Sequence, residues 1–114
     1  MLRQIREVLG DHELCLLCPE SLDVQFYLKV IPKLGIKRMS DHYFDNVSEY
    51  NRLRKNVKLY EAFAGYSHVL FHELDAFVFR DELHHWCQQS VDYIGAPWVY
   101  RMRSPRCLLY MGGK

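Results

Sequence analysis

The sequence predicts an α/β fold in which helices cover the faces of a parallel or mixed sheet. Segments with helical spacing of apolar residues alternate along the chain with short apolar runs of the kind that form strands. The 114 residues, 49% of them hydrophobic, supply enough apolar mass for the core of one domain. We therefore expect one sheet, with helices as the connections between its strands.

The first third of the chain shows this alternation. Residues 2–9 carry apolar side chains at helical spacing, and Gly10 is a plausible end for that helix. The run "ELCLLCP" over 13–19 is typical of a buried strand. A second helix is predicted over 21–35, with Ser21 as its N-cap.

The middle of the chain predicts a long helix after two short extended pieces at 36–39 and 43–44. Ser48 is the predicted cap, and the helix continues to about Ala64. Its apolar and aromatic positions fall three or four residues apart, at Leu53, Val57, Tyr60 and Phe63. The basic residues on it, Arg52, Arg54, Lys55 and Lys58, are interpreted as a solvated face, and contact with a bound diphosphate is the weaker alternative.

The next predicted strand, "SHVLFHELDAFVF" over 67–79, is interrupted by charged residues. A helix over 81–89 and an extended piece over 92–100 follow it. A carboxylate inside an apolar core costs several kcal/mol unless it is paired or bound to a metal. Glu73 and Asp75 are therefore expected to leave the sheet at its carboxyl edge, where ligands collect in α/β folds, and to share one face of the strand.

Charge and hydropathy exclude several classes of protein. The formal net charge of +1 gives no field that would attract nucleic acid or anionic lipid, so no nucleic-acid partner is expected. The chain has no apolar run of the roughly 18 residues that a membrane span requires, and its start lacks the apolar core of a secretory signal. We expect a cytoplasmic protein without a membrane span.

Four cysteines raise the question of a zinc or redox site. Cys15 and Cys18 have C-x-x-C spacing, but on a strand residues three apart point to opposite faces. A redox pair would also favour a helix N-terminus, and Pro19 follows instead. Reduced, buried thiols are the preferred interpretation for these two residues and for Cys87 and Cys107. A zinc site at Cys15 and Cys18 is the weaker alternative.

Several strings resemble one protein family. These are "YN" at residues 50–51, Tyr60, the pair Asp75-Ala76 and "VDYIGAPW" over 91–98. Together they resemble an uncharacterised family of glycosyltransferase-like proteins known as the domain of unknown function 5672, over roughly residues 1–100. The resemblance implies a partial GT-A-like fold, that of nucleotide-diphospho-sugar transferases, with a mixed sheet flanked by helices.

The resemblance also implies a function and its residues. In GT-A-like enzymes an acidic motif after a central strand holds Mn²⁺ or Mg²⁺, which stabilises the leaving nucleoside diphosphate. Here the matching element is Glu73-Leu74-Asp75, with Asp75 as the main metal ligand. Tyr50 and Asn51 would bind the donor, and a cap or staple role is held equally open for them. Asp92 and Trp98 are acceptor-side candidates; individually, each is also explained by a turn or by packing.

The expected function is a metal-dependent glycosyltransferase, or the core fragment of one, acting on a nucleotide-sugar donor and an unknown acceptor. The alternative is a non-catalytic α/β module of the same ancestry. The family's first strand would precede residue 1, and its "GNGGFSLR"-like string is replaced here by "RCLLYMGGK". Residues 1–114 are accordingly expected to form a single but incomplete domain, and no residue stands out as the catalytic base.

Overall fold

The computed structural model describes residues 2–95, 97–99 and 109–111. The chain groups into two compact units, Met1–Glu82 and Leu83–Lys114. The first unit holds a parallel pair of strands and most of the helices, and the second holds one helix and an antiparallel pair. The predicted mixture of helices and strands is therefore confirmed, although in the described residues each sheet has only two strands.

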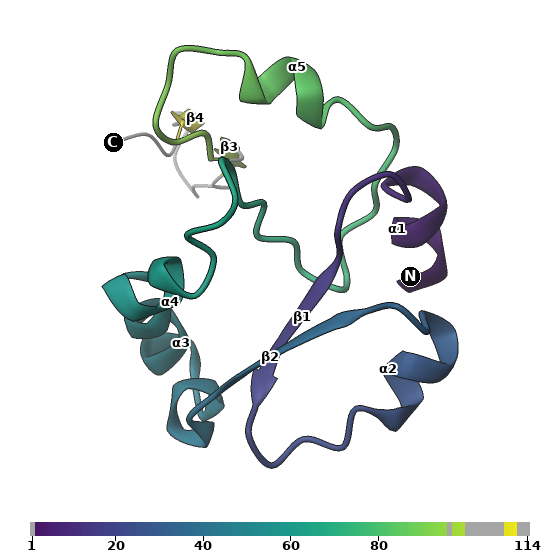
Figure 1. Ribbon diagram of the computed structural model, residues 1–114. Coiled ribbons are helices and arrows are strands. Elements are labelled where there is room, and N and C mark those ends of the chain that lie inside the picture. The colour runs from purple at the N-terminus through teal and green to yellow at the C-terminus, as the bar shows by residue number, and fades with distance from the viewer. Residues whose placement is uncertain (1, 96, 100–108, 112–114) are drawn as a thin grey trace. The chain divides into compact units, whose positions relative to one another are not determined.

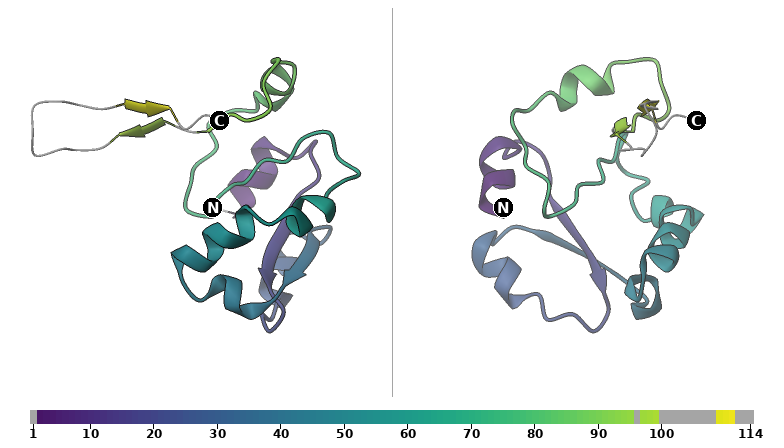
Figure 2. Two further views of the ribbon diagram at one scale, coloured as in Figure 1. Left: turned by 90° about the vertical axis from the view of Figure 1, so that its left-hand side faces the viewer. Right: turned by 180° about the vertical axis from the view of Figure 1, so that it is seen from behind.

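The first unit is built around a β-α-β arrangement. Strand β1 (Cys15–Pro19) pairs in parallel with β2 (Gly35–Met39), in a register that runs from Cys15↔Gly35 to Pro19↔Met39. Helix α2 (Gln25–Val30) forms the crossover between them. Figures 1 and 2 show α1 and α2 on one side of the two strands, with α3 and α4 on the other.

Helix α1 (Leu2–Val8) ends where the sequence predicts. Ile5 and Leu9 are buried, as expected for residues on one helical face. A Cβ atom on Gly10 would lie 2.7 Å from the carbonyl oxygen of Arg6. The close approach of backbone atoms explains why glycine stands at this helix end.

Helix α2 begins later than predicted, at Gln25 rather than at Ser21. The backbone N–H of Ser21 instead donates to Asp41 Oδ1 at 3.0 Å, and hydrogen bonds from Ser21 lower the pKa of Asp41. The chain between β1 and α2 is tied down by Arg38, whose Nη1 donates to the carbonyl oxygens of Glu20 and Leu22 at 2.8 and 2.9 Å. Ser21 therefore contributes to a loop contact and does not cap the helix.

The predicted long helix from Ser48 to Ala64 is two helices, α3 (Val47–Arg54) and α4 (Val57–Glu61). Asn46 caps α3 by accepting the Glu49 N–H at 2.9 Å. Asn56 caps α4 by accepting the Lys58 N–H, also at 2.9 Å. The second cap marks the start of a new helix and explains the break. Before α3, a 3₁₀ helix, η1 (Asp41–Phe44), replaces the extended piece predicted at 43–44.

The core of the first unit is small and apolar. Leu53 of α3 and Leu59 of α4 are only 1% and 0% exposed. Cys18 of β1 is 1% exposed. The other buried apolar residues are Ile5, Leu9, Val24, Ile31 and Leu34. Helices α1, α3 and α4 each contribute a buried residue to this core, and α2 ends beside the buried Ile31.

The predicted strand over 67–79 is wrong, because this segment is irregular apart from a turn between Glu73 and Ala76. Most of its apolar side chains are exposed, namely Val69, Leu70, Leu74, Phe77 and Phe79. Strand preference expresses how well a side chain packs on a half-buried pleated surface. No strand of the described residues pairs with this segment, so that surface is missing.

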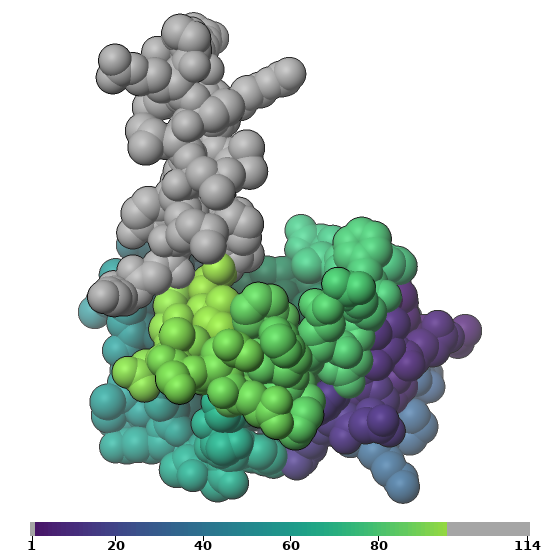
Figure 3. All heavy atoms as spheres, turned by 90° about the horizontal axis from the view of Figure 1, so that it is seen from above, coloured from purple at the N-terminus to yellow at the C-terminus, as the bar shows by residue number. Residues whose placement is uncertain are grey.

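Side chains of the N-terminal region hold the end of the same segment. The Val78 N–H donates to Gln4 Oε1 at 3.2 Å, and Gln4 Nε2 donates back to the Val78 carbonyl oxygen. His12 Nε2 lies 2.6 Å from Asp81 Oδ2. Figure 3 shows this part of the chain, in green, against the purple N-terminal residues. The segment is thus fixed to α1 and the turn after it by side chains.

The second unit contains α5 (Leu83–Cys87), β3 (Pro97–Val99) and β4 (Leu109–Met111). Helix α5 is shorter than the predicted helix over 81–89. The two strands are antiparallel, with Trp98 opposite Tyr110. In the described residues of the whole chain, no helix has the length and apolar character that crossing a bilayer requires.

Candidate functional site

One face of α3 meets the segment that carries the predicted acidic motif. Tyr50 and Arg54 lie four residues apart on this helix, so they share a face. The guanidinium carbon of Arg54 lies 5.0 Å from the centroid of the Phe71 ring. This contact is a cation–π interaction, which favours a fixed position for both side chains.

Tyr60 of α4 contacts both residues of this pair, Arg54 and Phe71. Its ring packs edge-on against Phe71, with 6.2 Å between the centroids. Its hydroxyl donates to the backbone carbonyl oxygen of Arg54. Arg54 is therefore held at its backbone by Tyr60 and at its side chain by Phe71.

Tyr50 lies partly buried between Phe44 and the acidic motif. Its ring centroid is 6.2 Å from that of Phe44. Burial, followed by the negative charge of Glu73, raises the pKa of Tyr50, and the positive charge of Arg54 acts against this rise. Tyr50, Arg54 and Glu73 are thus within electrostatic range of one another, and the Tyr50 hydroxyl remains protonated at neutral pH.

The acidic motif is a turn and not a strand end. The Ala76 N–H donates to the Glu73 carbonyl oxygen at 3.1 Å, which closes a turn over Glu73, Leu74, Asp75 and Ala76. Both carboxylate residues are exposed. The expectation that strand alternation places Glu73 and Asp75 on one face does not apply to this backbone. Their exposure agrees with the expectation that they leave the core.

His72, which lies between Phe71 and Glu73, is partly buried. Its Nε2 atom has no hydrogen-bond partner in the described part of the chain, although this atom is inaccessible to solvent. A buried polar atom without a partner is destabilising by about 1–3 kcal/mol.

Of the three other predicted site residues, only Asn51 belongs to the same unit as this cluster. Asn51 is exposed on α3, and the cap role once open to it belongs to Asn46. Asp92 is an exposed residue of the second unit. Trp98 lies in β3, and its side chain is outside the described part of the structure.

The cysteines form no metal site in the described residues. Cys18 is buried, Cys15 is exposed and Cys87 is intermediate, and all three are free thiols. Burial raises the pKa of both the Cys15 and the Cys18 thiol. The buried interpretation is confirmed for Cys18 and wrong for Cys15, and Cys107 lies outside the described residues. Within those residues no group of three or more His, Cys, Asp or Glu side chains gathers to hold a metal.

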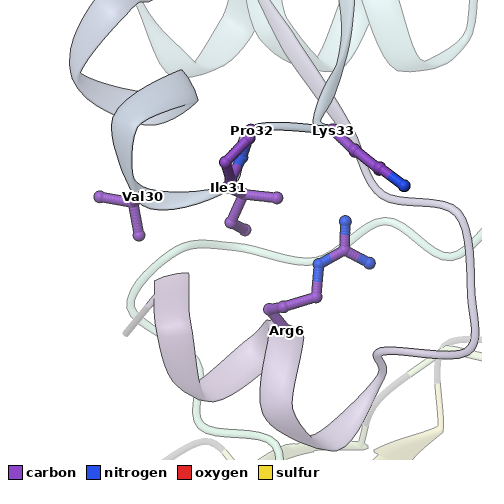
Figure 4. A pocket seen from close by; sticks show the side chains of 5 residues that line it. All are labelled: Arg6, Val30, Ile31, Pro32 and Lys33. Atoms are coloured by element: carbon purple, nitrogen blue, oxygen red, sulfur yellow. The ribbon is translucent and has the colours of Figure 1, made fainter.

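Two open pockets lie in the first unit. One, of about 330 Å³, is lined by Arg6 and by residues 30–33, and Figure 4 shows the Arg6 and Lys33 side chains bordering the same space. The other, of about 560 Å³, is lined by Leu2, Arg3, Phe26, Tyr27, Val30 and Leu74. Neither is lined by Tyr50, Glu73 or Asp75. The candidate site thus combines the partly buried Tyr50 and Arg54 with the exposed carboxylates of the turn.

Two residues of the cluster, Arg54 and Phe71, were not among the predicted site residues. Arg54 was grouped with the solvated basic face, yet its spacing from Tyr50 already placed both on one side of the helix. Phe71 looked like an ordinary strand residue. Only the packing of this segment against α3 and α4 reveals its role.

The fold and the cluster define a small α/β protein with a parallel β-α-β unit and an exposed acidic turn beside an arginine–tyrosine pair. The family model described as "Protein of unknown function (DUF5672)" matches residues 33–113, and the chain belongs to this family. The match includes Tyr50, Arg54, Glu73 and Asp75. Searches of curated proteins and of solved structures gave no significant match.

Proposed function

We propose that this protein is a metal-dependent glycosyltransferase, or the core of one, that moves a sugar from a nucleotide-sugar donor to an acceptor. The main support is that the face of α3 that carries Tyr50, a predicted donor residue, meets the segment that carries Glu73 of the predicted cation motif: the Arg54 guanidinium lies 5.0 Å from the Phe71 ring, two residues before Glu73. These two parts of the chain are separated by α4 and its flanking turns. Their approach is what a donor site with a metal-bound diphosphate requires.

The acidic turn has a donor set that fits Mg²⁺ or Mn²⁺. A hard cation of this kind is commonly held by one or two carboxylates and completes its shell with water and substrate phosphates. Glu73 and Asp75 are two exposed carboxylates within one turn. In the described residues no larger acidic or histidine cluster forms around them, which leaves coordination positions for a diphosphate.

Asp75 is the proposed principal ligand, and Glu73 is the second. The bound cation would neutralise charge that develops on the leaving nucleoside diphosphate. Tyr50 would donate its hydroxyl hydrogen to the donor, and the exposed Asn51 amide would add a polar contact next to it. Asp92 and Trp98 stay proposals for the acceptor side.

Calorimetric titration of Mn²⁺ and UDP or GDP tests the proposal. The parent protein should bind the nucleotide only when Mn²⁺ is present. Asp75→Asn removes one charge with little change of shape and should weaken this binding at least tenfold. Asp11→Asn is the matched control, because Asp11 is an exposed carboxylate in a turn of the same unit.

The outcomes separate the two candidate functions. If the parent binds neither nucleotide in the presence of Mn²⁺, the enzyme proposal is wrong for this chain and a non-catalytic module is the better description. If binding persists unchanged in Asp75→Asn, the metal ligand has been assigned to the wrong residue. An equal loss in the Asp11→Asn control would point to general electrostatics and also contradict the assignment.

A further inference from the structure

Arg54 has no acidic partner within the described residues, unlike Arg52 and Arg80 of the same unit. Arg52 Nη1 lies 3.0 Å from Glu49 Oε1, and Arg80 Nη2 lies 2.8 Å from Glu82 Oε1. Arg38 Nη1 donates hydrogen bonds to backbone carbonyl oxygens. Within the described residues Arg54 forms no ion pair, although its side chain is partly buried.

The position of Arg54 is nonetheless fixed. Phe71 covers one face of its guanidinium at 5.0 Å, and Tyr60 holds its backbone carbonyl oxygen. Stacking on an aromatic ring occupies the flat face of a guanidinium and leaves the N–H groups along its edge free to donate. These N–H groups match two oxygens of a phosphate in a bidentate contact. A positioned guanidinium with free donors is the feature expected of an oxyanion-binding residue.

The Tyr50 hydroxyl extends this donor surface, because Tyr50 lies four residues before Arg54 on the same face of α3 and a tyrosine hydroxyl can donate a hydrogen bond. Glu73, by contrast, would repel a bare phosphate. A cation on the acidic turn would offset that repulsion, so a metal-bound diphosphate fits better than free phosphate.

We propose that Arg54, stacked on Phe71 and flanked by the Tyr50 hydroxyl, forms a subsite for the phosphate groups of a metal-bound diphosphate. The identification of this diphosphate as part of a nucleotide sugar rests on the proposed function. Binding of the diphosphate group itself does not depend on it. The subsite places the cation on the acidic turn and the phosphate oxygens toward α3.

Inorganic pyrophosphate with Mg²⁺ is the probe, because it contains the diphosphate without nucleoside or sugar. Calorimetry should show binding to the parent and at least a tenfold higher Kd for Arg54→Gln. Arg54→Lys keeps the charge but loses the bidentate contact, so it should fall between the two. Arg52→Gln is the matched control on the same helix, and its Kd should equal that of the parent. Circular dichroism and urea unfolding of each variant verify the fold.

Two results would overturn the subsite: no pyrophosphate binding to the parent with or without Mg²⁺, or equal affinity in folded Arg54→Gln and Arg52→Gln. The titration also separates this inference from the proposed function. Loss of pyrophosphate binding in Arg54→Gln, together with no gain from adding a nucleoside to the diphosphate, would support the subsite and contradict the nucleotide-sugar function. Metal-dependent UDP binding that is lost in Asp75→Asn and kept in Arg54→Gln would support the nucleotide-sugar function and contradict the subsite.

Discussion

Replacing Asn46 by alanine should destabilise the first unit by about 1 kcal/mol. Asn46 Oδ1 accepts the Glu49 N–H at 2.9 Å, and this is one of the backbone donors at the start of α3 that no helical carbonyl can satisfy. Removal of an asparagine cap costs about 0.5–2 kcal/mol. The exposed position of Asn46 lets water replace the lost acceptor in part, which favours the middle of that range.

Urea unfolding at neutral pH, followed by circular dichroism, measures this effect. For a chain of this size, a loss of about 1 kcal/mol lowers the midpoint by roughly 0.5–1 M at an unchanged slope. Asn46→Asp retains the acceptor and adds a negative charge near the helix N-terminus, so its stability should equal or slightly exceed that of the parent.

Ser48→Ala is the decisive control, since the sequence first suggested Ser48 as the cap. In the structure Ser48 is an exposed residue inside the first turn of α3. Alanine has a high helix propensity there, so the change should stay within about 0.5 kcal/mol. A larger loss for Ser48→Ala than for Asn46→Ala would refute the assignment of the helix start.

Two further predictions concern the core and the thiols. Leu59→Ala should destabilise the protein by about 2–5 kcal/mol in urea unfolding because the side chain is fully buried, whereas Val57→Ala, at a 65% exposed position, should cost under about 1 kcal/mol. The exposed Cys15 should react with a thiol reagent before the buried Cys18. If so, the fast reaction should be absent in Cys15→Ser. Only the thiolate reacts, and burial raises the pKa of Cys15. The reaction rate of Cys15 should therefore still increase as the pH is raised beyond the ordinary pKa of a thiol. A plateau below that pH, or faster reaction of Cys18, would contradict the structure.

Local sequence signals predicted the β-α-β unit well. The strand Cys15–Pro19 lies within the predicted segment 13–19, the strand Gly35–Met39 begins one residue before the predicted segment 36–39, and a helix shorter than predicted lies between them. These elements satisfy their own preferences and pack on each other through short connections. Their formation therefore depends on information that lies close together in the chain.

The sequence contains a capping signal for the start of α3, but the cap was predicted at Ser48 instead. Asn46 is followed three residues later by Glu49, the spacing of a capping residue and its acidic partner. Ser48 is also a good capping residue, and the choice between them depends on which backbone N–H groups need an acceptor. The break at Asn56 has the same origin, because a second asparagine cap competes with continuation of the helix.

The segment 67–79 could not have been assigned from its own sequence. Its apolar residues are those of a strand, yet a strand forms only when a neighbouring edge supplies hydrogen bonds and a face to cover. In the described residues β1 pairs with β2 alone. The same limit applies to the site: the contact of Arg54 with Phe71 is a tertiary contact, and no spacing within the chain specifies it.

The irregular backbone of this segment has a consequence for the candidate site. Phe71 is fixed by Arg54 and Tyr60, and Val78 is fixed by Gln4, so the acidic turn lies between two anchored positions. Between these positions the backbone hydrogen bond from Ala76 to Glu73 closes the turn. The Phe71 ring and the Tyr60 hydroxyl contact the Arg54 side of the cluster, whereas Glu73 and Asp75 lie exposed on the turn. In the proposed subsite the phosphate groups would therefore bind beside Arg54, and the cation would bind at the exposed turn.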